Sequence, residues 1–276
     1  MLMVMSSFSK EINFGRIALL TFFLFYVLSW ICLHLFVPIG SSLYDYFTDS
    51  YGIIAGIGGL IGLKVAKKWG GRKSILGLSL LLFSVGLIFQ FLGQVSYAIY
   101  FYVYHIDNPY PSFGEIFYFG SIPIYIYGVY LLGKASGSSI SLRAIKNKIL
   151  VVIGPALATA TSYFIFLREY QFDWSLPVAV FLDFGYPVGE AIFISLALIA
   201  YVLTKPVLGG FMKKKVLFFI FALVTQYIAD TFFLYRTFSD TWYAGGFSDL
   251  LFVVSYFLMG YALLRFGHAV DKVGNV

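Results

Sequence analysis

The chain has 276 residues, of which 60% are hydrophobic, 21% aromatic and only 12% charged, with a mean hydropathy of +0.87. An ordinary soluble domain has about 25% charged residues, so a soluble globule is excluded. The 31 Phe and 22 Tyr exclude a disordered chain, and the single cysteine excludes a disulfide-stabilised scaffold.

Eight apolar runs follow one another, and most have the roughly 17–25 residues that a membrane-spanning helix needs. They predict helices at about 17–37, 50–66, 74–104, 113–133, 149–168, 178–203, 216–236 and 247–267. The first run is too long for a signal-peptide core and lacks a small-residue cleavage site, so we expect it to remain as a helix. The predicted fold is all-α, a single transmembrane bundle covering residues 1–276. A Ser/Gly-rich connection is expected at about 133–148.

The charges separate between the two sets of connections. All 19 lysines and arginines except Arg168 and Arg236 lie at the termini or in the connections after the second, fourth and sixth predicted helices. The positive-inside rule then predicts a multi-pass plasma-membrane protein with both termini in the cytoplasm. The net charge of +6 is explained as a topological signal and an attraction to anionic membrane lipids. Nucleic acid is not an expected partner, because no basic helix or RNA-binding motif accompanies the charge.

A short pattern recurs at three predicted helix starts: 110–117, 186–193 and 245–252. In each copy a small residue precedes a carboxylate, apolar residues follow, and a serine comes near the next turns (Ser121, Ser195 and Ser255). Residues 48–52 are interpreted as a degraded fourth copy. This pattern suggests four parallel two-helix hairpins, an arrangement known in membrane folds with internal repeats. The helix at 50–66 is rich in glycine, which indicates close packing against neighbouring helices.

All 13 acidic residues except Glu11 and Asp271 fall in the outer half of this topology. Two interpretations stay open for Glu115 and Asp249. Each can stabilise a helix start, since Ser112-x-x-Glu115 is a capping box and the helix dipole favours an acid there, or each can face a ligand. Asp183 and Glu190 lie inside the membrane if 178–203 is one helix that continues through Pro187.

Asp230 lies about fifteen residues into its predicted helix, without a capping position. A carboxylate there costs at least about 2.5–3.5 kcal/mol, so it should face the bundle interior and find partners. Gln226 lies one helical turn away. We hypothesise a polar, tyrosine-lined pocket in the outer half, formed by Asp230, Glu190, Glu115, Asp249, Gln94, Gln226 and Asp183. The alternative is a satisfied hydrogen-bond network between helices that binds no ligand.

Other site chemistries lack their residues. Three scattered histidines (His34, His105 and His268) and Cys32 form no metal-ligand spacing. No G-x-S-x-G or positioned Ser-His-Asp set is present, and the last two predicted helices carry no interior lysine for a retinal Schiff base. No catalytic or metal-ligating residue is assigned, and the sequence leaves the cofactor unknown.

Four motifs in order carry a resemblance to a known group of signalling proteins. They are Pro111-Ser112…Glu115…Tyr118, then Tyr186-Pro187…Glu190, Ala229-Asp230…Tyr235, and the helix opened by Asp249. Over roughly residues 75–265 the chain resembles the multi-helix N-terminal membrane regions of prokaryotic diguanylate cyclases and sensor histidine kinases. Glutamate stands where aspartate is usual at Glu115 and Glu190. No kinase or cyclase domain follows the last predicted helix, so the resemblance implies a sensory module whose output needs a separate cytoplasmic signalling protein.

We therefore expect a membrane sensory or ligand-binding module that reads an outer-side signal through its acidic and aromatic residues. The alternative is a transporter of cations or small molecules, coupled to protons through Asp230 and Glu190. An intramembrane enzyme is the third reading. Acids around one cavity at mid-depth would favour transport, whereas acids at the outer helix ends would favour sensing or a structural role. The ligand and the oligomeric state are not predicted.

Overall fold

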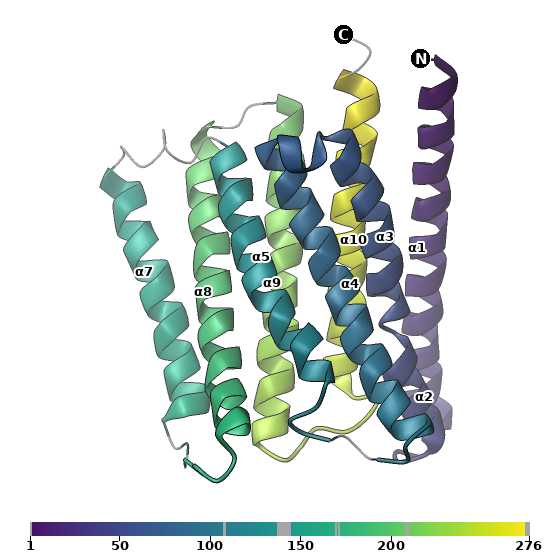
Figure 1. Ribbon diagram of the computed structural model, residues 1–276, viewed down its shortest axis with the longest axis vertical. Coiled ribbons are helices and arrows are strands. Elements are labelled where there is room, and N and C mark those ends of the chain that lie inside the picture. The colour runs from purple at the N-terminus through teal and green to yellow at the C-terminus, as the bar shows by residue number, and fades with distance from the viewer. Residues whose placement is uncertain are drawn as a thin grey trace.

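The computed structural model describes residues 2–106, 109–136, 145–168, 170, 172–207 and 210–273, which fold into helices (Figure 1). In chain order these are α1 (Leu2–Phe36), α2 (Ser42–Ser50), α3 (Ile53–Lys68), the 3-10 turn η1 (Gly71–Lys73), α4 (Ile75–Tyr102), α5 (Gly114–Ala135), α7 (Ile145–Ser162), the π-helical turn η2 (Tyr163–Leu167), α8 (Pro177–Val207), α9 (Gly210–Phe238) and α10 (Phe247–Val273).

Seven of the described helical segments are long and apolar enough to cross a membrane. One of them, Ser42–Lys68, combines α2 and α3, and Val152–Leu167 is a shorter apolar helix that continues from α7 into η2. The prediction of an all-α polytopic membrane protein is therefore confirmed. The predicted connection at 133–148 falls partly on residues 137–144, which lie outside the described residues.

The helix boundaries differ from the predicted ones in three places. The first helix begins at Leu2 rather than near residue 17, and α2 occupies a segment that was expected to be a connection. Ser41 caps α2 through its side chain. The apolar pattern did not predict this helix, because it contains polar residues such as Asp45 and Asp49. Finally, α8 ends at Val207 rather than near residue 203. It continues through Pro187 as one helix, which is one of the two interpretations left open.

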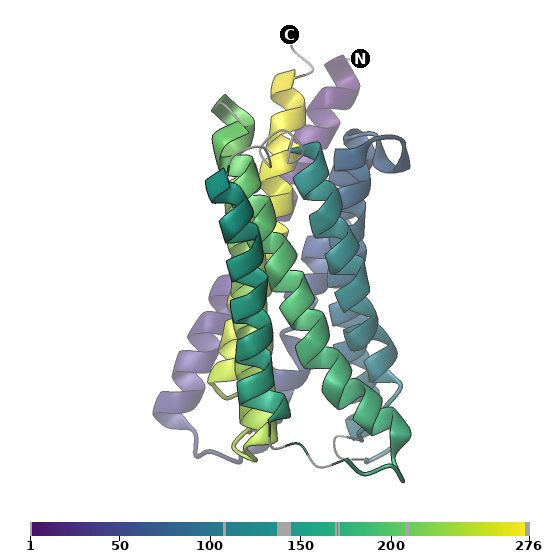
Figure 2. The ribbon, with the colours of Figure 1, turned by 90° about the vertical axis from the view of Figure 1, so that its left-hand side faces the viewer.

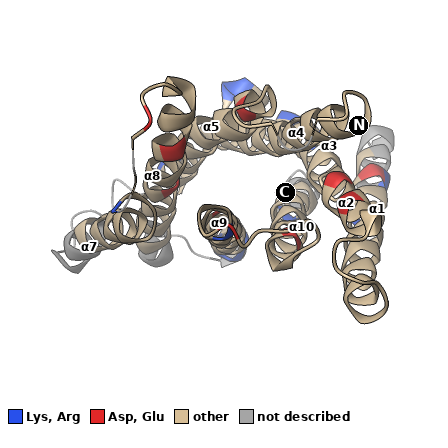
Figure 3. Ribbon diagram, turned by 90° about the horizontal axis from the view of Figure 1, so that it is seen from below, with Lys and Arg blue, Asp and Glu red and all other residues tan. Residues whose placement is uncertain are grey.

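Six helices form a closed ring in which each packs against the next: α3, α4, α5, α8, α9 and α10, with α10 returning to α3. Outside this ring, α1 packs mainly against α10, and α7 packs against α8. Figure 3 shows the ring in end view, with α4 and α5 on one side and α9 and α10 on the other. The ring is the element that gathers polar side chains from distant parts of the sequence.

Aromatic side chains fill the centre of the ring. The ring of Phe83 on α4 lies 4.5 Å from that of Phe219 on α9 and 6.2 Å from that of Tyr125 on α5, measured between centroids. Tyr125 in turn packs against Phe193 on α8, at 5.9 Å. Because these side chains are buried, polar groups among them lie in an apolar surrounding.

Glycines on α3 allow its two neighbours to approach closely, as the sequence indicated. A Cβ atom built on Gly58 would lie 3.0 Å from the Cα atom of Gly260 on α10. A Cβ atom built on Gly62 would lie 2.2 Å from the Ser84 hydroxyl on α4 and 2.6 Å from Leu263 on α10. Close backbone approach is the usual source of helix association inside membranes.

The two ends of the bundle differ in charge. Both termini lie at one end, which we call the terminal end (Figures 1 and 2). The opposite end, which we call the distal end, holds α2 and the connections that precede α5, α8 and α10, together with Glu115, Asp183 and Asp249. Lys67 and Lys68 lie in the last turn of α3 and Lys134 in that of α5, both at the terminal end. The described charges are therefore sorted by end in the way the sequence predicted.

Replacing Gly62 with alanine should destabilise the bundle, because the added methyl group must displace Ser84 and Leu263. Overpacking of this kind costs about 1–3 kcal/mol. The measurement is the thermal unfolding midpoint of the purified protein in detergent. Gly154→Ala on α7 is the matched control, since its Cβ would meet Leu198 only at an ordinary 3.7 Å. Equal midpoints for the two variants would contradict the close packing of α3.

Candidate functional site

The structure divides the predicted site residues into three groups. Asp249 is the centre of the first. Its carboxylate is 1% exposed and accepts hydrogen bonds from the Thr48 hydroxyl at 2.6 Å and from the Gly245 N–H at 2.8 Å. The Gln94 amide donates to the Thr48 carbonyl oxygen, and the Trp30 indole N–H donates to the Gly245 carbonyl oxygen at 3.0 Å. This group therefore ties α1, α2 and α4 to the start of α10.

Gly245 has a conformation that suits glycine, with φ +70, and a Cβ there would lie 2.5 Å from the Tyr44 ring. The turn it makes directs its N–H at Asp249, two residues into α10. The capping interpretation of Asp249 therefore holds, since its carboxylate satisfies a backbone donor beside the helix start.

Glu115 forms the second group, together with two tyrosines. The hydroxyls of Tyr97 on α4 and Tyr186 on α8 donate to its two carboxylate oxygens, and the side chain is 8% exposed. Nearby, Asp183 on α8 accepts hydrogen bonds from Tyr110 at 2.6 Å and from Tyr170 at 2.8 Å. Each carboxylate thus has a hydroxyl donor on each oxygen. The arrangement joins α4, α5 and α8 at the distal end.

Tyr170, in the connection before α8, remains a donor at any physiological pH. Burial and its hydrogen bond to Asp183 raise the pKa of the Tyr170 hydroxyl to about 12. Losing that proton would place two negative charges in direct contact. The tyrosine–carboxylate pairs of the distal end are therefore structural ties under ordinary conditions.

The third group lies deeper and is centred on Glu190 and Asp230. Glu190 lies 13 residues after the start of α8, which is about 20 Å along the helix. Its carboxylate and that of Asp230 on α9 interact electrostatically, and both interact with the Tyr125 hydroxyl on α5. Glu190 is 7% exposed and Tyr125 is 3% exposed. Asp230 is part-buried, so a buried and a part-buried acid from neighbouring helices interact with each other.

Polar side chains from four helices surround this pair. The Gln226 amide donates to both oxygens of Asp230 at 3.0 Å, and the Ser255 hydroxyl donates to the Gln226 carbonyl oxygen at 2.5 Å. The Tyr256 hydroxyl donates to the Gln90 carbonyl oxygen at 3.0 Å, and the Gln90 amide donates to Ser121 at 2.8 Å. We call the whole set the central cluster: Gln90, Ser121, Tyr125, Glu190, Gln226, Asp230, Ser255 and Tyr256.

Two atoms of the central cluster are left without partners. The Oε2 atom of Glu190 and the hydroxyl of Tyr125 are buried and have no hydrogen-bond partner in the described part of the chain. No described lysine or arginine forms an ion pair with Glu190 or Asp230; the ion pair that the structure shows, Lys64 with Glu11, is on the surface. An unpartnered buried carboxylate oxygen is costly, and such exceptions gather at functional sites.

The sequence predicted one pocket, and the structure instead separates its members. Asp230, Glu190 and Gln226 meet in the central cluster, whereas Asp249 and Gln94 belong to the first group and Glu115 and Asp183 to the second. The sequence analysis did not assign Tyr125 or Tyr256 to the site. The recurrent serines were a signal for part of it, since Ser121 and Ser255 both join the central cluster.

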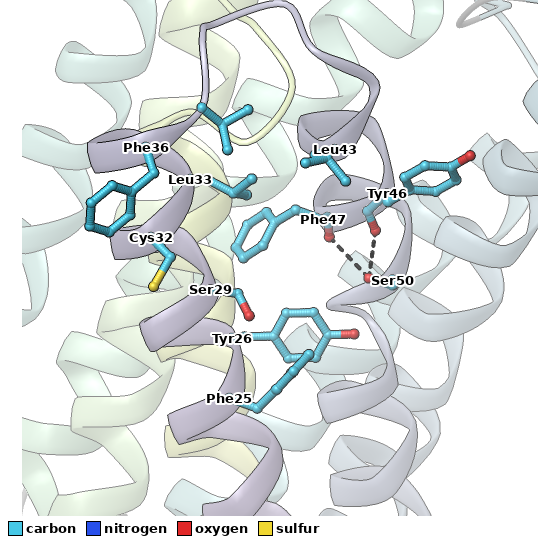
Figure 4. A pocket seen from close by; sticks show the side chains of 11 residues that line it. Phe25, Tyr26, Ser29, Cys32, Leu33, Phe36, Leu43, Tyr46, Phe47 and Ser50 are labelled. Atoms are coloured by element: carbon cyan, nitrogen blue, oxygen red, sulfur yellow. Dashed lines mark hydrogen bonds between the residues drawn. The ribbon is translucent and has the colours of Figure 1, made fainter.

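A groove of about 410 Å³ lies elsewhere, between α1 and α2, where the distal half of α1 leans away from the bundle (Figures 2 and 4). Apolar side chains line most of it, and its polar lining includes Ser29 and Ser50, whose hydroxyl donates to the Tyr46 and Phe47 carbonyls. Cys32, the single cysteine of the chain, is exposed on its wall. The groove contains none of the predicted site residues.

Comparison with known proteins gives no family assignment. No family model, no curated protein and no solved structure matches the chain. The chemistry of the described residues is therefore the basis for a functional proposal. In the described residues no group of three or more His, Cys, Asp or Glu is placed to hold a metal ion.

Removing the hydroxyls that hold Glu115 should weaken the distal end. Tyr97→Phe and Tyr186→Phe each leave one buried carboxylate oxygen without a donor, which should lower the free energy of unfolding by about 1–3 kcal/mol. Tyr235→Phe is the control, because Tyr235 is 53% exposed. The measurement is denaturant or thermal unfolding in detergent. If both variants had the same free energy of unfolding as wild type, these hydrogen bonds would contribute nothing to stability.

Proposed function

We propose that the chain is an integral membrane sensory protein whose ligand-binding site is the carboxylate pair of Glu190 and Asp230. The ligand class is a small cation, with the proton as its smallest member. The observation that carries the proposal is the electrostatic interaction of the buried Glu190 carboxylate with the part-buried Asp230 carboxylate among apolar and neutral polar side chains, with one oxygen of Glu190 unpartnered.

The reason lies in the energetics of buried charge. Moving a carboxylate into an apolar interior costs several kcal/mol, even after relaxation. A second carboxylate beside it adds repulsion, so both cannot be charged and unpaired. Arginine or lysine usually supplies the opposing charge, and the described residues offer none here. A bound proton or small cation is the remaining means of neutralising the pair.

The surroundings of the pair suggest how a change in its charge is transmitted. Glu190 and Asp230 lie on neighbouring helices of the ring. Hydrogen bonds lead from Asp230 through Gln226 to Ser255 on α10. The adjacent Tyr256 bonds to Gln90 on α4, which bonds to Ser121 on α5. Gain or loss of the cation changes the repulsion between α8 and α9. A ligand that binds two bundle conformations unequally shifts their populations.

The proposal includes the orientation and the output. The basic residues at the terminal end favour placing it in the cytoplasm of a plasma-membrane protein, with the distal end outside. The rearrangement would then reach the cytoplasmic connections, where a separate signalling protein reads it. Membrane lipids are partners through the basic terminal end.

Transport of a cation is the second candidate, and the depth of the pair favours it. Sites of secondary transporters lie near the middle of the membrane, and acids inside spanning helices are typical of proton and ion pathways. Glu115 and Asp249 do not add to this reading, since their oxygens are satisfied at the distal end. An intramembrane enzyme has no specific observation in its favour.

The first test uses Cys32 as a native attachment point for an environment-sensitive dye. It lies between α1 and α2, and α2 is tied to α10 through Thr48 and Asp249, so a ring rearrangement should change the emission. We expect a reversible change in emission on titration between about pH 5 and pH 9. The Glu190→Gln and Asp230→Asn variants should lose most of it, because one neutral amide removes the repulsion.

Asp173→Asn is the matched control. The hydroxyl and then the backbone N–H of Ser175 lower the pKa of Asp173, so this exposed carboxylate stays charged across the titrated range. The Asp173→Asn variant should therefore titrate as wild type does. A Glu190→Gln protein that keeps the amplitude and midpoint of wild type would overturn the assignment of the site.

Flux measurements separate sensing from transport. In proteoliposomes loaded with a pH-sensitive dye, a sensor shows no sustained proton or cation flux under an imposed gradient. Flux that depends on the protein and disappears in Asp230→Asn would replace the sensory proposal with the transport one. The Tyr235→Phe protein serves as the control for reconstitution.

A further inference from the structure

A row of buried polar side chains connects Asp249 at the distal end to the central cluster. Its first part is the Asp249 group described above, in which Gln94 binds the Thr48 carbonyl oxygen. Gln94 also interacts with the hydroxyl of Tyr51, one of the two residues between α2 and α3. The Oε1 atom of Gln94 is buried and has no hydrogen-bond partner in the described residues. A second unpartnered acceptor therefore lies on this row.

Tyr256 on α10 forms the second part of the row. Its ring lies 6.1 Å from that of Tyr51, and its hydroxyl binds Gln90. Tyr256 is 2% exposed and interacts electrostatically with both Asp249 and Asp230. The neighbouring Ser255 leads through Gln226 to Asp230. Tyr256 is thus placed between the distal carboxylate and the central pair.

The chemistry of the row suits a proton better than a larger cation. Tyrosine, serine and threonine hydroxyls both donate and accept hydrogen bonds, so a proton can arrive on one side and leave on the other. The two glutamines orient these hydroxyls. Dehydrating a metal cation would require a cage of oxygen ligands, typically six or more for calcium. In contrast, a proton needs only one hydrogen-bonded contact at each step, with water spanning the longer ones.

We propose that the ligand of the Glu190–Asp230 pair is the proton, and that it exchanges with the distal face through Asp249, Tyr51 and Tyr256. This inference rests on the proposed function, because it names the ligand and the route for the same site. The transfer is balanced: because Asp249 is buried, a water at the distal end passes the proton to it. The hydroxyls then relay the proton, and one oxygen of the central pair receives it. Release follows the reverse path.

Titratable and neutral polar groups from several helices face the two ends of this route, the central pair and Asp249. The central pair faces Tyr125 on α5, Tyr256 on α10 and the neutral Gln226 and Gln90 on α9 and α4. Asp249 faces Asp49 on α2 and the hydroxyls of Tyr51 and Tyr118. All of these ionisable neighbours are acids or phenols, so they favour a proton over a bare charge at both ends.

The test follows the carboxylic acid carbonyl band in the infrared after a pH jump on one side of an oriented proteoliposome membrane. With the full-length protein, acidifying the distal side should raise the band quickly, and acidifying the terminal side should not. Tyr256→Phe should slow the distal response about a hundredfold, the lower end of what a positioned proton-transfer group contributes. Tyr261→Phe, on the same helix but outside the row, should respond as wild type does.

The outcomes separate this inference from the proposed function. Equal response from both sides, or a Tyr256→Phe protein as fast as wild type, would overturn the route while leaving the pair as the site. A band that never responds to pH in wild type would overturn both. If Tyr256→Phe fails to fold, the sidedness of the wild-type response still decides the matter.

Discussion

The interior of this bundle depends on two interacting carboxylates, one buried and one part-buried, that have no opposing charge among the described residues. Glu190 and Asp230 come from neighbouring helices of a closed ring, and their partners are amides, hydroxyls and aromatic rings. A pair of this kind is stable only when a proton or cation neutralises it. Under the proposed function, the occupancy of the pair controls the repulsion between α8 and α9, and with it the arrangement of the ring.

The rest of the structure holds the ring together but leaves one oxygen of that pair without a hydrogen-bond partner. Glycines on α3 close the ring against α4 and α10, and hydrogen-bonded carboxylates join helices at the distal end: Asp249 through Thr48 and Gly245, and Glu115 through two tyrosines. Each oxygen of Glu115 accepts a tyrosine hydroxyl, and the Oδ2 atom of Asp249 accepts two hydrogen bonds, so both acids contribute to stability. Glu190, with its unpartnered oxygen, is different in kind. Glu115 and Asp249 thus lie near the distal end, whereas Glu190 lies deeper in the same bundle.

Sequence reasoning reached the membrane class and the sorting of charge because both follow from hydropathy and from where lysines occur. It placed Asp230 in the interior because no capping position was available to it.

The sequence did not predict α2, since Asp45 and Asp49 interrupt the apolar run on which the prediction depended. It also merged three groups of acids into one pocket, because depth is set by where each helix starts, and α8 begins 13 residues before Glu190. Tyr125 was not predicted, because no sequence pattern distinguishes it from the other tyrosines among the 22 of the chain. Only the packing of α5 shows that its hydroxyl interacts with the pair. The resemblance to sensor membrane regions stays a prediction.

The most direct measurement of the central claim is the protonation state of Glu190 and Asp230 in the membrane. Carbon-13 solid-state NMR of labelled protein in lipid, with Glu190→Gln and Asp230→Asn for assignment, resolves protonated from charged carboxyl carbons. At neutral pH and without added metal cations, the pair should hold a proton, and alkaline pH should remove it. Two fully charged carboxylates under those conditions would contradict the account.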